Sequence, residues 1–223
     1  DLIKAQKLAA WTEAAQRIAH EIKNPLTPIR LAAERLRVKH REGAPEIGEL
    51  LEESVATIVR EVGKMQALVD EFSRYARMPG PQLAATAIEG LVSEVVALYR
   101  DVKPGVAIRT ELAPGIGEVW VDPEQLRRVL INLLDNALEA TEPPGDVTVR
   151  GERRGERLIL EVADEGSGIA TEDRGKLFLP FFSRKKRGTG MGLAIVHRIV
   201  SDHNGAIRVA DNVPRGTVFT IEL

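Results

Sequence analysis

The segment HEIKNPLTPI, residues 20–29, places a histidine directly before a carboxylate. Apolar residues recur at three- and four-residue steps on both sides, which predicts a helix. His20 lies about 160° around that helix from the apolar residues two positions away, so we expect its imidazole to face solvent. Glu21 is adjacent, and Asn24 follows one turn later on the same face. These groups could act as nucleophile, base and orienting amide, although a lone solvated histidine is the alternative interpretation.

Two prolines, three residues apart, follow the histidine. Pro25 and Pro28 have no N–H, so the carbonyls of Glu21 and Asn24 lose their helical partners. Each proline costs about 3 kcal/mol in an ordinary helix interior, and a kink is the expected result. Strain beside an exposed His–Glu pair favours a functional site, although a bend without chemistry stays open.

A second group of polar residues lies in the C-terminal part of the chain. In NLLDNALEA, residues 132–140, Asn132 and Asn136 share one face of an apolar helix. A carboxamide oxygen is a hard ligand suited to Mg²⁺ bound with substrate phosphates. In DEGSGI, Asp164 ends a strand and can accept a hydrogen bond from an exocyclic amine, while Gly166 and Gly168 permit a close backbone turn.

The stretch RKKRGTGMGL, residues 184–193, places four cationic side chains before alternating glycines and a helix start. Backbone N–H groups at a helix N-terminus favour anions, so this stretch predicts a phosphate site. A solvated basic loop is the alternative. The spacing is neither a Walker motif nor a dinucleotide-binding fingerprint.

The predicted elements that position these groups fall into two parts. Residues 1–77 read as two long helices separated by the turn at 40–45, and such a hairpin needs a partner, so we predict a homodimeric four-helix bundle. Residues 78–82 form a linker rich in proline and glycine, and 83–223 a second domain. In that domain we predict helices at 88–101 and 123–141 and a third helix that ends at about 203. We predict strands at 105–112, 117–121, 146–152 and 156–164, and a β-hairpin at 206–222. The predicted strands are more numerous than parallel βαβ units would require. This pattern predicts an α/β sandwich with helices on one face of a sheet.

The amino-acid composition limits which molecules the protein can bind and in which cellular compartment we expect it. A net charge of −2 and an aromatic fraction of 4% argue against direct nucleic-acid binding. The absence of cysteine excludes disulfides and fits a reducing compartment. No apolar run is long enough to span a membrane, and the chain starts inside a helical pattern. We therefore expect a cytoplasmic fragment of a longer, membrane-anchored receptor, attached to the membrane only through segments outside this sequence.

The motifs together resemble those of the bacterial two-component sensor histidine kinases. HEIKNPLTPI is similar to the H box, NLLDNALEA to the N box, DEGSGI to the G1 box, LFLPFF to the F box and GTGMGL to the G2 box, in family order. The run WTEAAQRIAHEIKNPLTPIRLAAERL looks most like the nitrogen-regulation NtrY-like branch. This resemblance implies a dimerisation and phosphotransfer domain followed by a GHKL-type (Bergerat) ATP-binding domain.

The resemblance also implies a role for each motif residue. His20 would accept the phosphoryl group, Glu21 would act as its base, and Asn24 would position water for dephosphorylation of a response-regulator receiver domain. Mg²⁺ would be held by Asn136, and Asp164 would read the adenine amino group of ATP. The remaining nucleotide-binding residues implied by the family are Asn132, Gly166, Gly168, Lys185, Gly188, Thr189, Gly190 and Gly192.

Three positions, Glu165, Met191 and Glu139, depart from the family pattern, and the first two do not threaten nucleotide binding. Glu165 replaces a common Asn, and Met191 a common Leu. Glu139 replaces a basic residue near the phosphates, so Arg184, Lys186 or Arg187 would supply that charge. Asn132 stands where ATP-hydrolysing relatives carry a general-base Glu, which favours phosphoryl transfer to an external nucleophile. A net phosphatase, a non-catalytic scaffold and a stand-alone ATPase stay as rival interpretations.

Overall fold

The computed structural model describes residues 2–43, 47–184 and 189–223, and for residues 2–21 and 74 it describes the backbone alone. The chain divides into two compact units. One contains the helical hairpin up to Met78, and the other contains Pro79–Phe182 and Gly192–Leu223. Within the described ranges, no helix combines the length and apolar character needed to cross a lipid bilayer.

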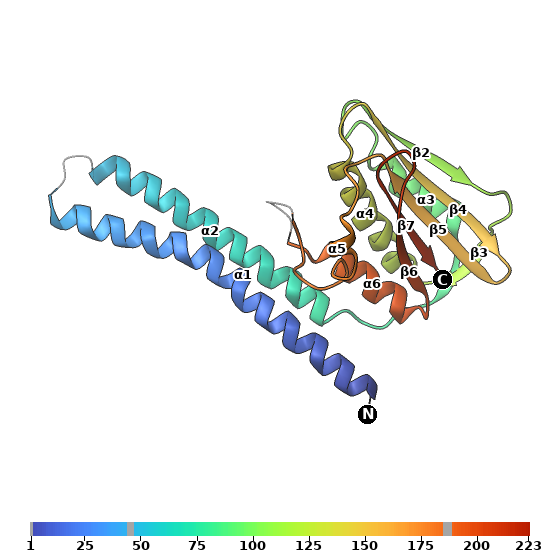
Figure 1. Ribbon diagram of the computed structural model, residues 1–223, viewed down its shortest axis with the longest axis horizontal. Coiled ribbons are helices and arrows are strands. Elements are labelled where there is room, and N and C mark those ends of the chain that lie inside the picture. The colour runs from blue at the N-terminus through green and yellow to red at the C-terminus, as the bar shows by residue number, and fades with distance from the viewer. Residues whose placement is uncertain (1, 44–46, 185–188) are drawn as a thin grey trace. The chain divides into compact units, whose positions relative to one another are not determined.

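The N-terminal unit is the predicted helical hairpin. Helices α1 (Leu2–Arg41) and α2 (Ile47–Ala76) run side by side in opposite directions (Figure 1). Helix α1 continues through Pro25 and Pro28, and the Thr27 hydroxyl donates a hydrogen bond to the carbonyl of Lys23 at 3.3 Å. The prolines therefore do not end the helix, and the kink stays a prediction.

The hairpin leaves much of its apolar stripe uncovered. On α2 the buried side chains include two polar ones, Ser54 and Glu61. By contrast, four apolar residues that recur at four- and seven-residue steps along α2 are exposed, at 44–49% for Leu51, Val55, Val62 and Val69. A single hairpin therefore does not bury the surface that the α2 heptad pattern supplies.

The second unit is built on a five-stranded sheet. Its strand order is β2-β4-β5-β7-β6, in which β2 pairs in parallel with β4 and the other neighbours are antiparallel. The strands are β2 (Val106–Leu112), β4 (Gly145–Arg154), β5 (Arg157–Asp164), β6 (Ala206–Asp211) and β7 (Thr217–Glu222). One parallel pair among antiparallel ones agrees with the predicted sandwich and excludes a doubly wound fold.

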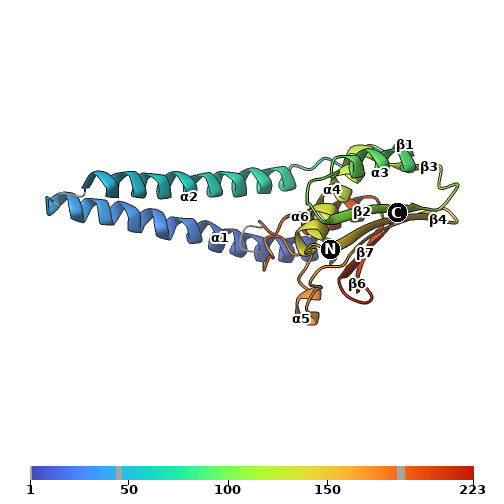
Figure 2. The same ribbon diagram turned by 90° about the horizontal axis from the view of Figure 1, so that it is seen from above.

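Three helices cover one face of this sheet: α3 (Ile88–Ala97), α4 (Pro123–Ala140) and α6 (Gly192–Asp202) (Figures 1 and 2). Alternate residues of the central strands point toward them, including the aligned row Val149, Val162 and Phe219. The opposite face carries cross-strand ion pairs such as Arg150 with Glu111 at 2.9 Å. The period-two pattern of the strands therefore separates a core face from a solvated face.

Helix α4 is fixed at both ends. Asp122 caps its N-terminus by accepting hydrogen bonds from the backbone N–H groups of Glu124 and Gln125, both at 3.0 Å. At its C-terminus the Lys103 ammonium donates to the carbonyls of Leu138 at 2.8 Å and Thr141 at 2.6 Å. These bonds satisfy helix-end groups that would otherwise lack partners, so α4 is a rigid support for the asparagines that it carries.

A side-chain hydrogen bond also holds the middle of α4. The Tyr99 hydroxyl donates to Asp135 Oδ1 at 2.7 Å. Burial, and then the Asp135 carboxylate, raise the pKa of Tyr99, so the phenol keeps its proton.

Two short elements were not predicted. Strand β1 (Ala84–Ala87) has the sequence AATA, which lacks a strand signature, and it forms by pairing with β3 (Glu118–Val121). The four-residue helix α5 (Thr171–Arg174) lies between the predicted strand at 156–164 and the predicted helix that ends at 203, where no element was predicted. The predicted end of α3 at residue 101 is wrong, because the helix stops at Ala97.

Candidate active site

The HEIKNPLTPI motif lies on α1, but the side chains of His20 and Glu21 are outside the described residues. Asn24 is described and exposed, and Pro25 beside it is buried. The predicted solvent-facing position of the His20 ring therefore stays a prediction. Asn24 has the access to solvent that its predicted role with water requires.

One face of α4 collects residues from three motifs. Asn132, Asn136 and Ala140 are spaced by four residues, so they lie in a row along the helix about 12 Å long. At one end of the row, Asn132 Oδ1 lies so near Gly192 that a Cβ on that glycine would come within 2.8 Å of it. At the other end, a Cβ on Gly166 would come within 2.6 Å of the Ala140 carbonyl oxygen. Two predicted glycines from distant motifs therefore bracket the asparagine row.

The asparagines are held on a half-buried surface. Asn132 donates a hydrogen bond through Nδ2 to the Arg128 carbonyl at 2.7 Å, and this bond orients its carboxamide. Asn136 is half-buried one turn later. Among the residues that the structure describes, no group of three or more His, Cys, Asp or Glu side chains could hold a metal ion.

Asp164 is the last residue of β5, and its carboxylate is buried. Its Oδ1 accepts hydrogen bonds from the backbone N–H groups of Gly166 at 2.9 Å and Thr217 at 3.2 Å. Asn212 donates through Nδ2 to the Asp164 carbonyl at 2.9 Å. The carboxylate is therefore fixed in orientation by two separate segments, as a base-reading group requires.

Two residues beside Asp164 were not singled out from the sequence. Gly216 has a φ of +108°, and a Cβ there would lie 1.8 Å from the Asp164 carbonyl oxygen. Thr217 is buried and donates its backbone N–H to the Asp164 carboxylate. Both residues open the segment GTVFTI, residues 216–221, and the pairing of β5 with β7 brings this segment to Asp164.

Glu165, which replaces a common Asn, has a structural role. Its Oε2 accepts a hydrogen bond from the Asp146 N–H at 3.1 Å, and its own N–H donates to the Asp146 carbonyl at 3.2 Å. The substitution therefore ties the glycine turn to the start of β4. The neighbouring Gly168 has a φ of +74°, which favours glycine in that turn.

The predicted lid is described only in part. Lys185, Lys186, Arg187 and Gly188 lie outside the described residues. Gly190 has a φ of +70°, and the Thr189 hydroxyl accepts a hydrogen bond from the Met191 N–H at 3.4 Å. Gly192 begins α6. Which cation of the lid faces the phosphates stays a prediction.

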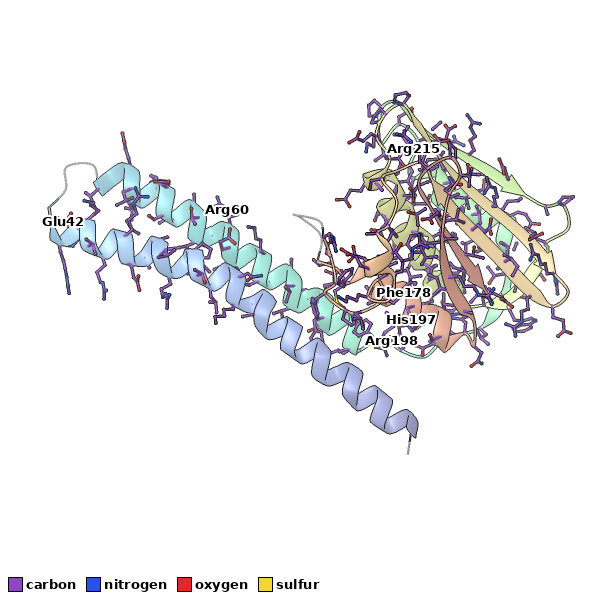
Figure 3. The ribbon with its side chains drawn as sticks, in the orientation of Figure 1. Glu42, Arg60, Phe178, His197, Arg198 and Arg215 are labelled. Atoms are coloured by element: carbon purple, nitrogen blue, oxygen red, sulfur yellow. The ribbon has the colours of Figure 1, made fainter. Side chains whose placement is uncertain are left out.

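The other described histidines have packing or surface positions. His40 is exposed. The His197 ring stacks on Phe178 of the LFLPFF motif, with centroids 5.4 Å apart, and Figure 3 shows the two side by side. This partial burial lowers the pKa of His197. The His203 ring bonds the Asp122 N–H through Nε2 at 3.0 Å and the Ile199 carbonyl through Nδ1 at 2.8 Å.

Comparison with known proteins identifies both units. Residues 10–81 match the family model of the His Kinase A (phospho-acceptor) domain. Residues 121–223 match the model of the histidine kinase-, DNA gyrase B- and HSP90-like ATPase. These two matches define a phosphoacceptor hairpin followed by an α/β ATP-binding domain.

Individual relatives agree with this division. The nitrogen regulation protein NtrY of Azorhizobium caulinodans is 40% identical over all of this chain, which covers 30% of NtrY. The mycobacterial sensor histidine kinase MprB is 30% identical, with a TM-score of 0.58, over 64% of this chain and 97% of that one. Histidine kinase ThkA, solved in complex with the response regulator protein TrrA, is 28% identical with a TM-score of 0.74, over 98% of this chain and 63% of that one.

The chain belongs to the sensor histidine kinase family. The predicted resemblance to the NtrY-like branch is confirmed as a similarity to NtrY and to NtrY-like kinases. The chain spans about a third of the length of these curated relatives.

Proposed function

We propose that this chain autophosphorylates on His20 from Mg²⁺–ATP and passes the phosphoryl group to an aspartate of a response-regulator receiver domain. The observation that carries the proposal is the row Asn132–Asn136–Ala140 on α4, bracketed by Gly192 and Gly166. It joins three motifs of the nucleotide site into one continuous surface beside the fixed carboxylate of Asp164.

Each residue of that surface has a proposed role toward ATP. Asp164 accepts a hydrogen bond from the adenine amino group, and Gly166 and Gly168 let the backbone approach the base. Lys185, Gly188, Thr189, Gly190 and Gly192 form the lid over the phosphates. Asn136 holds Mg²⁺ with help from Asn132, and the ion, when bound, offsets the negative charge of the phosphates.

In the transfer step, a ring nitrogen of His20 attacks the γ-phosphorus of ATP. The new N–P bond forms as the bond from phosphorus to the β,γ-bridging oxygen breaks, ADP leaves, and Glu21 takes the imidazole proton. The protein contributes mostly positioning and charge stabilisation. Asn132 is a carboxamide and cannot act as a general base near neutral pH, so water is not activated at that position.

We propose that the working form is a homodimer joined through a four-helix bundle. The exposed stripe on α2, with Val62 at 47% and Val69 at 49% exposure, supports this proposal because a second hairpin would cover it. Ser54 and Glu61 of α2 are buried while these apolar residues are exposed, so the apolar side suits a second copy.

The receiver partner and the reverse reaction extend the proposal. ThkA, which this chain resembles in fold, was solved with a response regulator, and we propose a partner of the same class here. We also propose that Asn24, exposed one turn after His20, positions water to dephosphorylate that partner. Asn24→Ala is then expected to lose phosphatase activity and keep autophosphorylation.

The test is incubation of the full chain with γ-labelled ATP and Mg²⁺. We expect an acid-labile, base-stable phosphoryl adduct on the wild type and none on His20→Gln, with both proteins binding ATP equally. A labelled His20→Gln protein would refute the acceptor assignment. ATP binding without label on either protein would favour a scaffold.

A further inference from the structure

Strand β2 forms one edge of the five-stranded sheet (Figure 1). Among the strands that the structure describes, β4 is its only neighbour, and the two pair in parallel. At the two ends of this pairing, the Gly105 carbonyl accepts a hydrogen bond from the Gly145 N–H at 3.2 Å, and the Ala113 N–H donates to the Gly151 carbonyl at 2.8 Å. Alternate residues of a parallel strand bond the same neighbour, so the odd-numbered residues of β2 bond β4. The backbone N–H and C=O groups of the even-numbered residues therefore point toward the edge.

The side chains beside this edge leave it accessible. Thr110 is exposed in the middle of β2, although it pairs with the buried Val149 and so shares the face that the helices cover. A groove of about 680 Å³ runs along this side, between β2 and α3, and its α3 wall includes the small exposed residues Ser93 and Ala97. An added strand would therefore find backbone groups to pair with and room for its own side chains.

On the opposite face, β2 carries two opposite charges, two positions apart. Arg109 is exposed and lies 2.7 Å from the Asp146 carboxylate of β4, and Glu111 is exposed and lies 2.9 Å from the Arg150 guanidinium of β4. Charges on an edge strand discourage pairing unless the incoming strand brings the opposite charge to the same level. The strand that fits this edge therefore has an acidic residue opposite Arg109 and a basic residue opposite Glu111.

Strand β2 itself meets this requirement in one antiparallel register. With Thr110 on a two-fold axis, Arg109 lies opposite Glu111 of the second copy, and Glu111 lies opposite Arg109 of the second copy. In the same register, Ile108 and Leu112 lie opposite each other on the helix-covered face. The two neighbouring registers centre Arg109 or Glu111 on the axis and place like charges directly opposite each other. Electrostatics therefore selects the register centred on Thr110.

We propose that the β2 edge binds β2 of a second copy of this chain, antiparallel and centred on Thr110, so that two five-stranded sheets join into one. The outward backbone groups of Ile108, Thr110 and Leu112 would form about six hydrogen bonds across the join. The two charge pairs would occupy the closer, non-hydrogen-bonded positions. The contact is isologous, so it closes at two copies.

This surface is separate from the exposed stripe on α2 that the hairpin dimer would use. Strand β2 has only seven residues, so the join is small. We expect it to be weak between separate chains and to persist where another contact already holds two copies together.

The wild-type chain has no cysteine, so a single introduced cysteine reports on the join. In Thr110→Cys, two copies of the same residue would meet at the axis with a Cα–Cα spacing of about 5.5 Å, which a disulfide can span. We expect the full-length chain with this change to form a covalent dimer under mild oxidation. Ala107→Cys is the matched control, because it is exposed on the same strand but its two copies would lie about 20 Å apart. Each rate is divided by the rate at which the same thiol reacts with iodoacetamide, which removes differences in thiol reactivity.

Charge reversal in the Thr110→Cys protein tests the register. Arg109→Glu would place glutamates opposite each other in both charge pairs, and we expect disulfide formation to slow about tenfold. Adding Glu111→Arg restores opposite charges across the join and is expected to restore the rate. The double reversal also leaves each new charge beside a like charge of its own sheet, Asp146 or Arg150, so damage to the fold would slow the reaction further instead.

A Thr110→Cys rate no higher than that of Ala107→Cys would overturn the proposal and leave the edge to a strand of a different protein. A rate that charge reversal does not change, or that the double reversal does not restore, would overturn the register on which the proposal depends. None of these measurements requires kinase activity, so their outcome is independent of the proposed function.

Discussion

The most direct test of the nucleotide site is the replacement Asp164→Asn. The Asp164 Oδ1 is held by the N–H groups of Gly166 and Thr217, and a carboxamide oxygen can accept both bonds. The fold is therefore expected to survive. The amide would then turn its NH₂ group toward the base, where the proposed site needs an acceptor for the adenine amino group.

The expected magnitude follows from the charge on the acceptor. A hydrogen bond to a charged group contributes about 1.5–3 kcal/mol, so losing it weakens ATP binding roughly 10- to 150-fold. Inosine triphosphate carries a carbonyl oxygen in place of the amino group, and it is expected to bind Asp164→Asn better than it binds the wild type. The variant should therefore reverse or abolish the preference for ATP.

Isothermal titration calorimetry of the full chain with each nucleotide and Mg²⁺ measures both effects. Asp202→Asn is the matched control, because it makes the same chemical change on an exposed residue of α6. Unchanged ATP affinity in a folded Asp164→Asn protein would refute base reading by this carboxylate. Equal losses for both nucleotides would show general damage to the pocket.

Three further predictions concern stability and assembly. Gly216→Ala places a Cβ 1.8 Å from the Asp164 carbonyl oxygen at a φ of +108°, and should lower the unfolding free energy by about 2–5 kcal/mol in urea titration. Gly175→Ala, with open space and a φ of −69°, should change it little. Because burial lowers the pKa of His197, the unfolded chain binds a proton that the folded chain does not as pH falls below about 6.5. The unfolding free energy should therefore fall as the pH falls through that range. Urea denaturation at pH 7.5 and 5.5 measures this fall, and His197→Gln should reduce it. An equal fall in the variant and the wild type would contradict the assignment to His197. Val62→Asp puts a charge on the exposed α2 stripe and should convert a dimer to monomers in analytical ultracentrifugation, whereas a wild-type monomer would contradict the dimer.

The local sequence was sufficient to predict those elements in which apolar residues recur with a regular period. Apolar residues that recur at three- and four-residue steps predict helices from sequence, because side-chain burial repeats with the helical turn. Helices α2 and α4 were both predicted from the sequence. The motif residues Asn132, Asn136 and Asp164 were identified from their residue types and their places on a predicted helix and at a strand end, with the family resemblance giving each a role. Strand β1 was missed because AATA has no intrinsic strand preference and is extended only through its pairing with β3.

The sequence by itself therefore determined the two-part organisation, the principal helices and strands, the motif residues and the family. The tertiary structure decided which groups meet: Gly192 with Asn132, Gly216 and Thr217 with Asp164, and the linker with Asp122 and Gln125. These contacts join residues about 40 to 60 positions apart, and they depend on strand register and helix packing. No local pattern encodes such distances, because the partners are chosen only when the core closes.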